Sequence, residues 1–204
     1  MSDEPLLSVE AFGCERDGRR LFHDLTFTLG AGEALELKGP NGSGKSTLLK
    51  AIAGLYTDYT GTIRAADRLY LGHRPGLGLL LTAEENLRWY AALGAADGAR
   101  PPIAEALARV GMAGYERVPC QQMSAGQLRR VGLARLLVCA APLWLLDEPL
   151  TALDRSGQVL VRGLIEEQRG RGGAVLCATH QALGLPGAGT LSLEVQHAST
   201  EDGG

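Results

Sequence analysis

One glycine-rich segment constrains this chain more than any other feature. Residues 39–47 read Gly-Pro-Asn-Gly-Ser-Gly-Lys-Ser-Thr, which fits the phosphate-binding pattern G-x-x-x-x-G-K-[ST]. A short apolar strand is predicted directly before this loop, over residues 34–37. A helix is predicted directly after it, over residues 45–55 with a stop at Gly54. Strand, glycine loop and helix in this order aim backbone N–H groups and a helix N-terminus at an anion, so the sequence predicts an α/β fold that binds phosphate groups.

The residues of this phosphate-binding loop have separate expected roles. Lys45 supplies a cation for the outer phosphates, and the Ser46 hydroxyl is a suitable ligand for Mg²⁺. The alternative is a glycine-rich turn that matches the pattern by chance, and the flanking strand and helix argue against it. We assign the other residues of the loop to nucleotide binding as well: Gly39, Pro40, Asn41, Gly42, Ser43, Gly44 and Thr47.

A second candidate site follows an apolar run. Residues 143–148 read Leu-Trp-Leu-Leu-Asp-Glu, which predicts a strand buried on both faces that ends in two acids. Open α/β sheets bind ligands at the carboxyl ends of their strands. Asp147 is therefore a candidate to hold Mg²⁺ through water, and Glu148 a candidate to orient or deprotonate an attacking water. The alternative is a polar strand end followed by a turn at Pro149.

A third feature lies between these two. Ser124, Ala125, Gly126 and Gln127 precede an apolar helical stretch, and Ser124 with Gln127 three residues later form a predicted capping box. A capped helix N-terminus with little side chain at Gly126 is also suited to cradle a phosphate. Both interpretations stay open at this point.

Composition excludes several classes of protein. The chain has 204 residues, 45% of them hydrophobic, which is ordinary for a globular protein, and its net charge of −3 argues against a nucleic-acid partner. The N-terminus is acidic rather than a secretory signal, and no run of about 18 apolar residues predicts a membrane span. The four cysteines lack metal-ligand spacing and are expected to be reduced, buried thiols.

Periodicity places the remaining elements. We expect one domain over residues 1–204, with a helical subdomain inserted at about 73–140 and a polar tail at 197–204. Strands are predicted at residues 6–12, 21–29, 62–64, 69–71, 174–178 and 191–195, and helices at 82–93, 103–110, 124–139 and 155–169.

These motifs in this order resemble the ATP-binding-cassette (ABC) ATPases. The phosphate-binding loop is followed by Met-Ser-Ala-Gly-Gln at 123–127, the strand ending in Asp147 and Glu148, Leu-Asp at 153–154 and Thr-His at 179–180. The resemblance runs from residue 6 to residue 195. It implies the α/β fold of a P-loop NTPase, with a parallel sheet, an N-terminal antiparallel β-subdomain and an inserted α-helical subdomain.

A narrower resemblance is to the ATP-binding subunits of bacterial haem exporters, which serve cytochrome c biogenesis. It is carried by Leu-Gly-His-Arg-Pro-Gly at 71–76, Leu-Thr-Ala-Glu-Glu-Asn at 81–86, and the segments 124–135 and 143–154. The implied partners are ATP, Mg²⁺, a second copy of the chain and integral-membrane permease subunits. The implied location is peripheral, on the cytoplasmic face of the inner membrane.

The family also implies a mechanism in which the chain works as a pair. Lys45 and Glu148 act in hydrolysis, and His180 supports the γ-phosphate. The signature residues of the other copy, Ser124 to Gln127, close over that phosphate, and Asp154 of the D-loop senses the opposite subunit.

Three positions depart from the wider family pattern. Ala125 stands where most cassettes have a glycine, and His73 stands where most have a glutamine that links Mg²⁺ to the membrane subunit. Arg16 replaces the aromatic residue that stacks on adenine, and a guanidinium can stack on a planar base as well. Phe12 is the alternative partner for adenine.

Several other residues are assigned structural roles. Trp89 and Tyr90 are expected to pack in the core, although with residues 77–81 they are also candidates for an apolar groove that receives a helix of a membrane partner. Trp144 is expected in the core, and His23 and His197 in solvent. The pair Arg129 and Arg130 is expected on a solvated helix face.

Other functions remain as alternatives. A soluble ABC ATPase that assists iron–sulfur assembly would carry the same motifs, as would a transporter ATPase for another substrate. A small-molecule kinase shares the phosphate-binding loop but does not explain residues 124–127 or 153–154. A nucleotide-binding module without catalysis does not explain Glu148 and His180.

Overall fold

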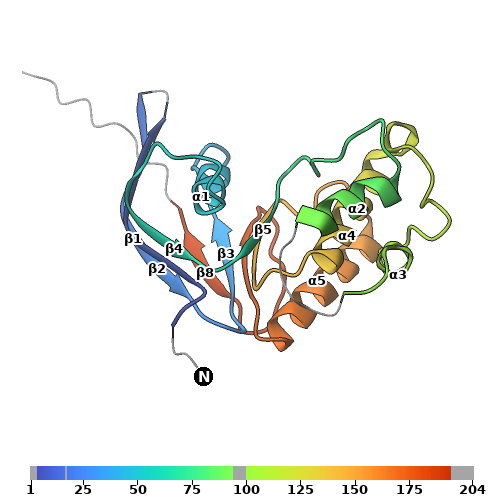
Figure 1. Cartoon of the computed structure of the whole chain (residues 1–204). Helices are drawn as coiled ribbons and strands as arrows, with labels where there is room; N and C mark the ends of the chain where they lie inside the picture. Colours follow the sequence, from blue (N-terminus) through green and yellow to red (C-terminus); the bar gives the residue numbers. More distant parts are fainter. Residues whose placement is uncertain (1–3, 17, 94–99, 194–204) are drawn as a thin grey trace, which may run out of the picture.

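The computed structural model describes residues 4–16, 18–93 and 100–193, which form two sheets and two groups of helices (Figure 1). The antiparallel sheet has the order β2-β1-β4, and the parallel sheet has the order β5-β6-β7-β3-β8. The antiparallel strands are β1 (Leu7–Arg16), β2 (Arg19–Leu29) and β4 (Thr60–Ala65). The parallel strands are β3 (Ala34–Lys38), β5 (Arg68–Leu71), β6 (Leu143–Asp147), β7 (Ala174–Ala178) and β8 (Gly189–Ser192).

The helices lie on either side of the parallel sheet. Helix α1 packs with the antiparallel sheet on one side, and α2, α3, α4 and α5 gather on the other (Figure 1). Their bounds are α1 Lys45–Ile52, α2 Ala83–Leu93, α3 Ile103–Arg109, α4 Ala125–Val138 and α5 Arg155–Gly170, with a short 3₁₀ turn at Cys120–Gln122.

Strand β6 shows why the sequence has an uninterrupted apolar run at this place. Leu143 and Leu145 pack in the core shared with α1 and the antiparallel sheet, whereas Trp144 and Leu146 pack in the core shared with α4 and α5. All five residues of the strand are buried. The predicted strand with two covered faces is confirmed, and so is the core position of Trp144.

The strand order brings the two candidate sites to one edge of the sheet. Strand β7 lies between β6 and β3, and all three run parallel, so the loop after β3 and the acids after β6 emerge on the same side. Two backbone hydrogen bonds extend this edge: Glu148 N–H donates to the Ala178 carbonyl at 2.8 Å, and Thr179 N–H donates to the Leu37 carbonyl at 3.3 Å.

Some predicted ends are wrong for identifiable reasons. Strand β1 continues to Arg16 because bulges break its register with β2, and the alternation of apolar residues is lost there. Helix α1 ends at Ile52 rather than at residue 55, since Gly54 adopts a φ of 76° and closes the helix. The last strand begins at Gly189, two residues before the predicted start at 191, and ends at Ser192, and residues 194–195 of the predicted strand lie outside the described residues. The predicted tail at 197–204 and His197 lie outside the described residues.

The cysteines and the absence of a membrane span agree with the sequence. Cys14, Cys120, Cys139 and Cys177 are free and buried, and burial raises the pKa of each thiol. Of the helices in the described ranges, none combines the length and apolar character that crossing a bilayer requires.

Candidate functional site

The phosphate-binding loop is held open by glycine geometry. Gly44 has a φ of 92° and precedes the first residue of α1. A side chain there would bring its Cβ to 2.5 Å from the ring of Phe22, so only glycine fits. Lys45 is almost buried, and its Nζ donates to the carbonyls of Gly39 at 2.7 Å and Pro40 at 3.0 Å. The ammonium is thereby held inside the loop, where it can exchange these carbonyls for phosphate oxygens.

The loop and the β6 acids meet directly. Ser46 Oγ donates to Asp147 Oδ1 at 3.1 Å, and the Tyr70 hydroxyl donates to Asp147 Oδ2 at 3.3 Å. Burial and the neighbouring Asp147 carboxylate raise the pKa of Tyr70, so its hydroxyl stays protonated and donates. A hydroxyl and a carboxylate in contact are hard oxygen ligands, and this donor set fits Mg²⁺. Sequence analysis did not single out Tyr70, because its contact with Asp147 depends on the pairing of β5 with β6.

Glu148 and His180 form a second pair beside the first. His180 Nδ1 lies 2.8 Å from Glu148 Oε2. The two residues follow the ends of β6 and β7, which are neighbouring strands. Glu148 adopts a φ of 50°, a conformation that residues other than glycine seldom adopt and that tends to occur at functional sites.

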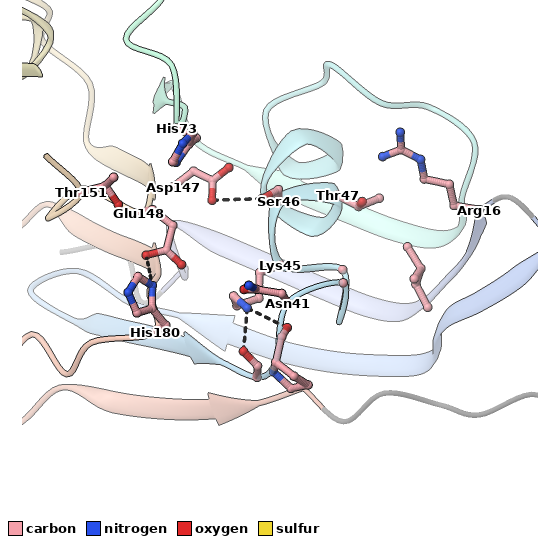
Figure 2. Close-up of a pocket in the computed structure, with 15 residues that line it drawn as sticks. Arg16, Asn41, Lys45, Ser46, Thr47, His73, Asp147, Glu148, Thr151 and His180 are labelled. Carbon is pink, nitrogen blue, oxygen red and sulfur yellow. Dashed lines mark hydrogen bonds and ion pairs between the residues drawn. The ribbon is translucent and has the colours of Figure 1, made fainter. Parts of the chain in front are cut away.

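The phosphate-binding loop and both of these pairs, Ser46 with Asp147 and Glu148 with His180, line one cavity of about 1000 Å³, whereas Tyr70 does not line it. Figure 2 shows Lys45, Ser46, Asp147, Glu148 and His180 facing it from α1 and from the ends of β6 and β7. Thr151, which sequence analysis did not propose, also lines the cavity. Among the predicted loop residues, those in the lining are Gly39, Pro40, Asn41, Gly42, Gly44 and Thr47.

Ser43 is the exception within the loop. It is 2% exposed, and its Oγ has no hydrogen-bond partner. A Cβ on Gly39 would lie 2.7 Å from that oxygen, so Gly39 and Ser43 pack closely at the base of the loop.

The two unusual positions lie at different ends of the cavity. His73 is near Asp147, whereas Arg16 lies at the end opposite Glu148, and both line the cavity (Figure 2). Phe12, the alternative adenine partner, is fully buried and packs on Phe22 with ring centroids 5.4 Å apart, so it cannot stack on a ligand.

The signature residues do not line the cavity of their own chain. The capping box is present: Gln127 N–H donates to Ser124 Oγ at 3.2 Å, and Ser124 N–H donates to Gln127 Oε1 at 2.9 Å. Ser124 and Ala125 are exposed, and Gly126 lies close to a carbonyl, since a Cβ there would be 3.2 Å from Ala152 O. This capped N-terminus is therefore not part of the lining of the chain's own cavity.

Asp154 has a local structural role. Its side chain accepts from Gly157 N–H at 2.9 Å and caps α5, and it pairs with Arg130 at 2.9 Å. The hydrogen bond from Gly157, followed by those from Ser156 and Arg130, lowers the pKa of Asp154.

The prediction that Arg129 lies on a solvated helix face is wrong. The residue is 3% exposed, and its guanidinium is directed at the site by donating to backbone carbonyls. Burial lowers its pKa, and the Asp147 carboxylate opposes that effect. Arg129 links α4 to the segment that carries His73 and to the strand end that carries Glu148. The five acceptors are Gly72 at 2.8 Å, His73 at 3.3 Å, Asp147 at 3.2 Å, Glu148 at 2.7 Å and Pro149 at 3.3 Å.

The expected packing of the aromatic pair on α2 is half right. Tyr90 is partly buried, and the Arg135 guanidinium lies 3.7 Å from the centre of its ring. Trp89 is 56% exposed and contacts Tyr90 edge-on, so it is a surface residue rather than a core residue. His23 is exposed, as predicted.

Comparison with known proteins defines the class. A family model described as "ABC transporter" matches residues 22–151. The structure titled "Structure of ATP binding subunit of ABC transporter" superposes with a TM-score of 0.83 at 26% identity, covering 94% of this chain and 88% of that one. A dimeric ATP-binding cassette bound to ADP and Pi superposes with a TM-score of 0.81 at 22% identity, over 94% of this chain and 97% of that one, which supports the fold. The molecule is an ABC-type ATPase.

Sequence relatives narrow the assignment. A "Cytochrome c biogenesis ATP-binding export protein CcmA" from Saccharophagus degradans is 43% identical over 91% of this chain and 92% of the relative. The protein of the same description from Pseudomonas putida strain KT2440 is 45% identical over 87% of this chain and 90% of the relative. The chain therefore belongs to the cytochrome c biogenesis ATP-binding export proteins of the ABC transporter family.

Proposed function

We propose that this chain binds and hydrolyses ATP to drive a separate membrane permease in haem export for cytochrome c biogenesis. The observation that supports this best is the shared cavity, in which a phosphate-binding loop faces Asp147, Glu148 and His180. A phosphate-binding loop alone would bind a nucleotide, and the adjoining pair of acids adds the groups needed to hydrolyse it. We treat residues 1–204 as one domain with a helical insertion at about 73–140.

The proposed chemistry uses residues of three strand ends. The loop N–H groups and Lys45 bind the phosphates of ATP. Glu148 accepts the proton of the attacking water as its oxygen bonds to the γ-phosphorus, and the bond to the β–γ bridging oxygen breaks. His180 keeps the Glu148 carboxylate in place through its Nδ1 contact and lies beside the γ-phosphate.

Mg²⁺ fits the oxygen set described above. Ser46 and Asp147, the latter through water, would hold the ion, with His73 as a further ligand or hydrogen-bond partner. Bound there, the ion supplies positive charge to the β- and γ-phosphate oxygens. Arg16, at the far end of the cavity, is the residue we assign to the adenine base, by stacking.

The working unit in this proposal is a homodimer. The residues Ser124, Ala125, Gly126 and Gln127 do not line their own cavity, yet they form a capped helix N-terminus, exposed at Ser124 and Ala125 and suited to an anion. In the dimer they close over the γ-phosphate held by the other copy. Asp154, at the start of α5, faces the opposite subunit.

The membrane partner would bind an exposed apolar surface on the helical side. We call it the leucine surface and define it by five exposed side chains: Leu79 (54%), Leu80 (81%), Leu81 (42%), Trp89 (56%) and Leu93 (61%). Large apolar side chains that are exposed on α2 and on the segment before it are suited to a protein or membrane contact. Asn86 fixes the loop that carries them, because its side chain bonds the Gly78 N–H and the Gly78 and Thr82 carbonyls. We place the chain peripherally, on the cytoplasmic face of the inner membrane.

The experiment that tests this function uses the Glu148→Gln variant, which should bind ATP without hydrolysing it. The tagged variant is purified from detergent-solubilised native membranes with ATP present, and the proteins that accompany it are identified. Multi-span cytochrome c maturation proteins are the expected partners. Other multi-span partners would support the transporter role but rule out haem export. Soluble partners alone would replace the proposal with a role in assembly.

A further inference from the structure

One carboxylate is buried within the parallel sheet. Glu36 of β3 is 5% exposed, and it is not among the residues that line the ATP cavity. Side chains alternate between the two faces of a strand, so Glu36 shares the face of Ala34, which packs in the core with α4 and α5. Burying a carboxylate among apolar groups is unfavourable unless it is paired or hydrogen-bonded. The groups that contact Glu36 therefore indicate what it does.

Glu36 is bonded to the segment that follows His180. Its Oε1 accepts from the Leu183 N–H at 3.2 Å, and Lys38 Nζ lies 3.1 Å from its Oε2. Leu183 is 1% exposed, so water has little access to replace Oε1 as the acceptor. Because the phosphate-binding loop begins directly after β3, Glu36 connects the strand that carries this loop to the segment after His180.

Helix α5 holds the same residue from a second side. Arg162 Nε donates to the Leu183 carbonyl at 2.6 Å. The N–H and the carbonyl of Leu183 are thus bonded to side chains of two different elements, β3 and α5. We call these two hydrogen bonds the Leu183 clamp. Since α5 begins directly after Asp154, the clamp also joins the helix of the D-loop to the segment after His180.

The start of this segment is fixed to β3 as well. Thr179 N–H donates to the Leu37 carbonyl at 3.3 Å. The Thr179 hydroxyl accepts from the Gln181 N–H at 3.1 Å and donates to the Gln181 carbonyl at 2.8 Å. Residues 180–182 are exposed, so core packing does not hold them. Their position depends on the fixed residues on either side, Thr179 and Leu183.

We propose that Glu36 is a positioning residue for His180, acting through the Leu183 clamp, and that Arg162 supports the same clamp from α5. A histidine side chain that is 58% exposed gains little from packing, so its backbone must be held for the 2.8 Å contact with Glu148 to persist. This inference rests on the proposed function, in which His180 and Glu148 act at the γ-phosphate.

Kinetics of two substitutions at Glu36 give the first test. Glu36→Leu removes the acceptor and keeps a side chain of similar size. Its kcat should fall about tenfold, because His180 is held less firmly. Its KM for ATP should stay within a factor of about two, since the loop still binds the phosphates. Glu36→Gln keeps an oxygen that accepts from the Leu183 N–H, and it should retain at least about half of the wild-type kcat.

The matched control is Gln168→Leu, which also replaces a buried polar side chain by leucine. Gln168 lies on α5, is 8% exposed and is not part of the cavity lining. Its Nε2 donates to the carbonyls of Ala141 at 2.9 Å and Pro142 at 3.1 Å. The melting temperature of Gln168→Leu should fall, as that of Glu36→Leu does, but its kcat should stay at the wild-type value.

The other arm of the clamp provides a variant that disturbs the core less. Arg162 is only partly buried, so Arg162→Met should fold even if Glu36→Leu does not. Its kcat should fall about threefold, because the Leu183 N–H remains bonded to Glu36. If Glu36→Leu fails to fold, Arg162→Met takes its place in every measurement.

The His180 ring supplies a readout that does not depend on hydrolysis. Two-bond ¹H–¹⁵N correlations of the histidine rings are recorded at about pH 8, where an ordinary histidine is neutral. His180→Ala assigns the signal by its loss. The wild type should show the proton on Nδ1, because the contact with the Glu148 carboxylate requires a donor there. Glu36→Leu should lose this pattern, whereas Glu36→Gln and Gln168→Leu should keep it.

The outcomes separate this inference from the proposed function. An unchanged His180 signal in Glu36→Leu overturns the inference, whatever the rate does, and so does an equal fall of kcat in Gln168→Leu. A changed signal with wild-type kcat would confirm that Glu36 positions His180 but would remove His180 from the reaction, so the proposed mechanism would fail instead. If the wild-type chain hydrolyses no ATP, the proposed function fails, and the ring signal still decides the role of Glu36.

Discussion

Glu148 and His180 are joined by a contact of 2.8 Å between Oε2 and Nδ1, across the ends of two neighbouring parallel strands. A carboxylate only accepts hydrogen bonds, so Nδ1 carries the proton whenever Glu148 is ionised. The Glu148 side chain is 17% exposed and that of His180 58%, which leaves the histidine ring open toward the cavity. The Glu148 carboxylate is therefore oriented before any substrate binds, and the exposed His180 ring is free to contact a ligand in the cavity.

The first prediction concerns this carboxylate. Glu148→Gln keeps the size of the side chain and an oxygen that accepts from His180, but it removes the base. Hydrolysis should fall about 100-fold or more. Affinity for ATP should stay within a factor of about two, since the phosphates are held by the loop. Phosphate release and equilibrium binding of a fluorescent ATP analogue measure the two quantities.

A matched control for this prediction is Glu105→Gln, an exposed glutamate on α3 outside the ATP cavity. It should hydrolyse ATP at the wild-type rate. If Glu148→Gln hydrolysed ATP as fast as this control, Glu148 would not be the base.

The second prediction concerns Arg129. Arg129→Met fills similar space but removes the Arg129 donors from five backbone carbonyls, which should cost about 3 kcal/mol of unfolding free energy or more. For a chain of this length that is a fall of roughly 6 to 12 °C in melting temperature. Arg129→Lys keeps the charge but cannot span all five acceptors. Its kcat should fall about tenfold with little change in KM for ATP, because the strand end that carries Glu148 is held less firmly.

Arg88→Lys is the control here, since Arg88 is 67% exposed and forms a surface ion pair with Glu84. A surface ion pair contributes about 0 to 1 kcal/mol, so its melting temperature should hardly move. Equal, small effects of Arg88→Lys and Arg129→Lys on kcat would show that Arg129 is structural filling and does not position the site.

Arg129 also illustrates what the sequence could and could not predict. The strand and helix around residues 39–47, the capping box and the place of the two acids at the end of β6 were predicted correctly, because each depends on residues next to one another in the chain. The role of Arg129 depends on carbonyls that are 18 to 57 residues away in sequence. Two adjacent arginines after a helix cap are typical of a solvated helix face. Only the packing of α4 against the sheet shows that Arg129 is buried.

Which aromatic residue of α2 is exposed was outside the reach of the sequence for a different reason. Trp89 and Tyr90 are adjacent aromatic residues on one helix, yet one is exposed and the other covers Arg135. Periodicity does not separate them, because α2 has so few fully buried positions, namely Ala83, Asn86 and Leu87.

The third prediction concerns pH. The hydrogen bond from Gly157 N–H lowers the pKa of Asp154 in the folded chain below the ordinary value of about 3.9. A depressed folded pKa means that the ionised carboxylate stabilises the fold above the unfolded pKa, and that this contribution is lost as pH falls through the folded pKa. Asp154→Asn still caps α5 but carries no charge. The wild type should therefore unfold at higher urea than the variant at pH 6, and the gap should shrink at about pH 3. A gap that stays constant would mean that the charge of Asp154 contributes nothing.

The last prediction tests whether the signature acts across two copies. Ser124→Asp keeps a good helix cap, so α4 should stay folded, but it sets a negative charge against the γ-phosphate. Alone it should be inactive, and so should Glu148→Gln. In a mixed dimer one site combines Glu148 of the first variant with Ser124 of the second, and that site is intact. Mixing equal amounts should therefore restore activity to about one quarter of the wild type, because half of the symmetric dimers are mixed and one of their two sites works. Subunits whose signature served their own cavity would gain nothing from mixing.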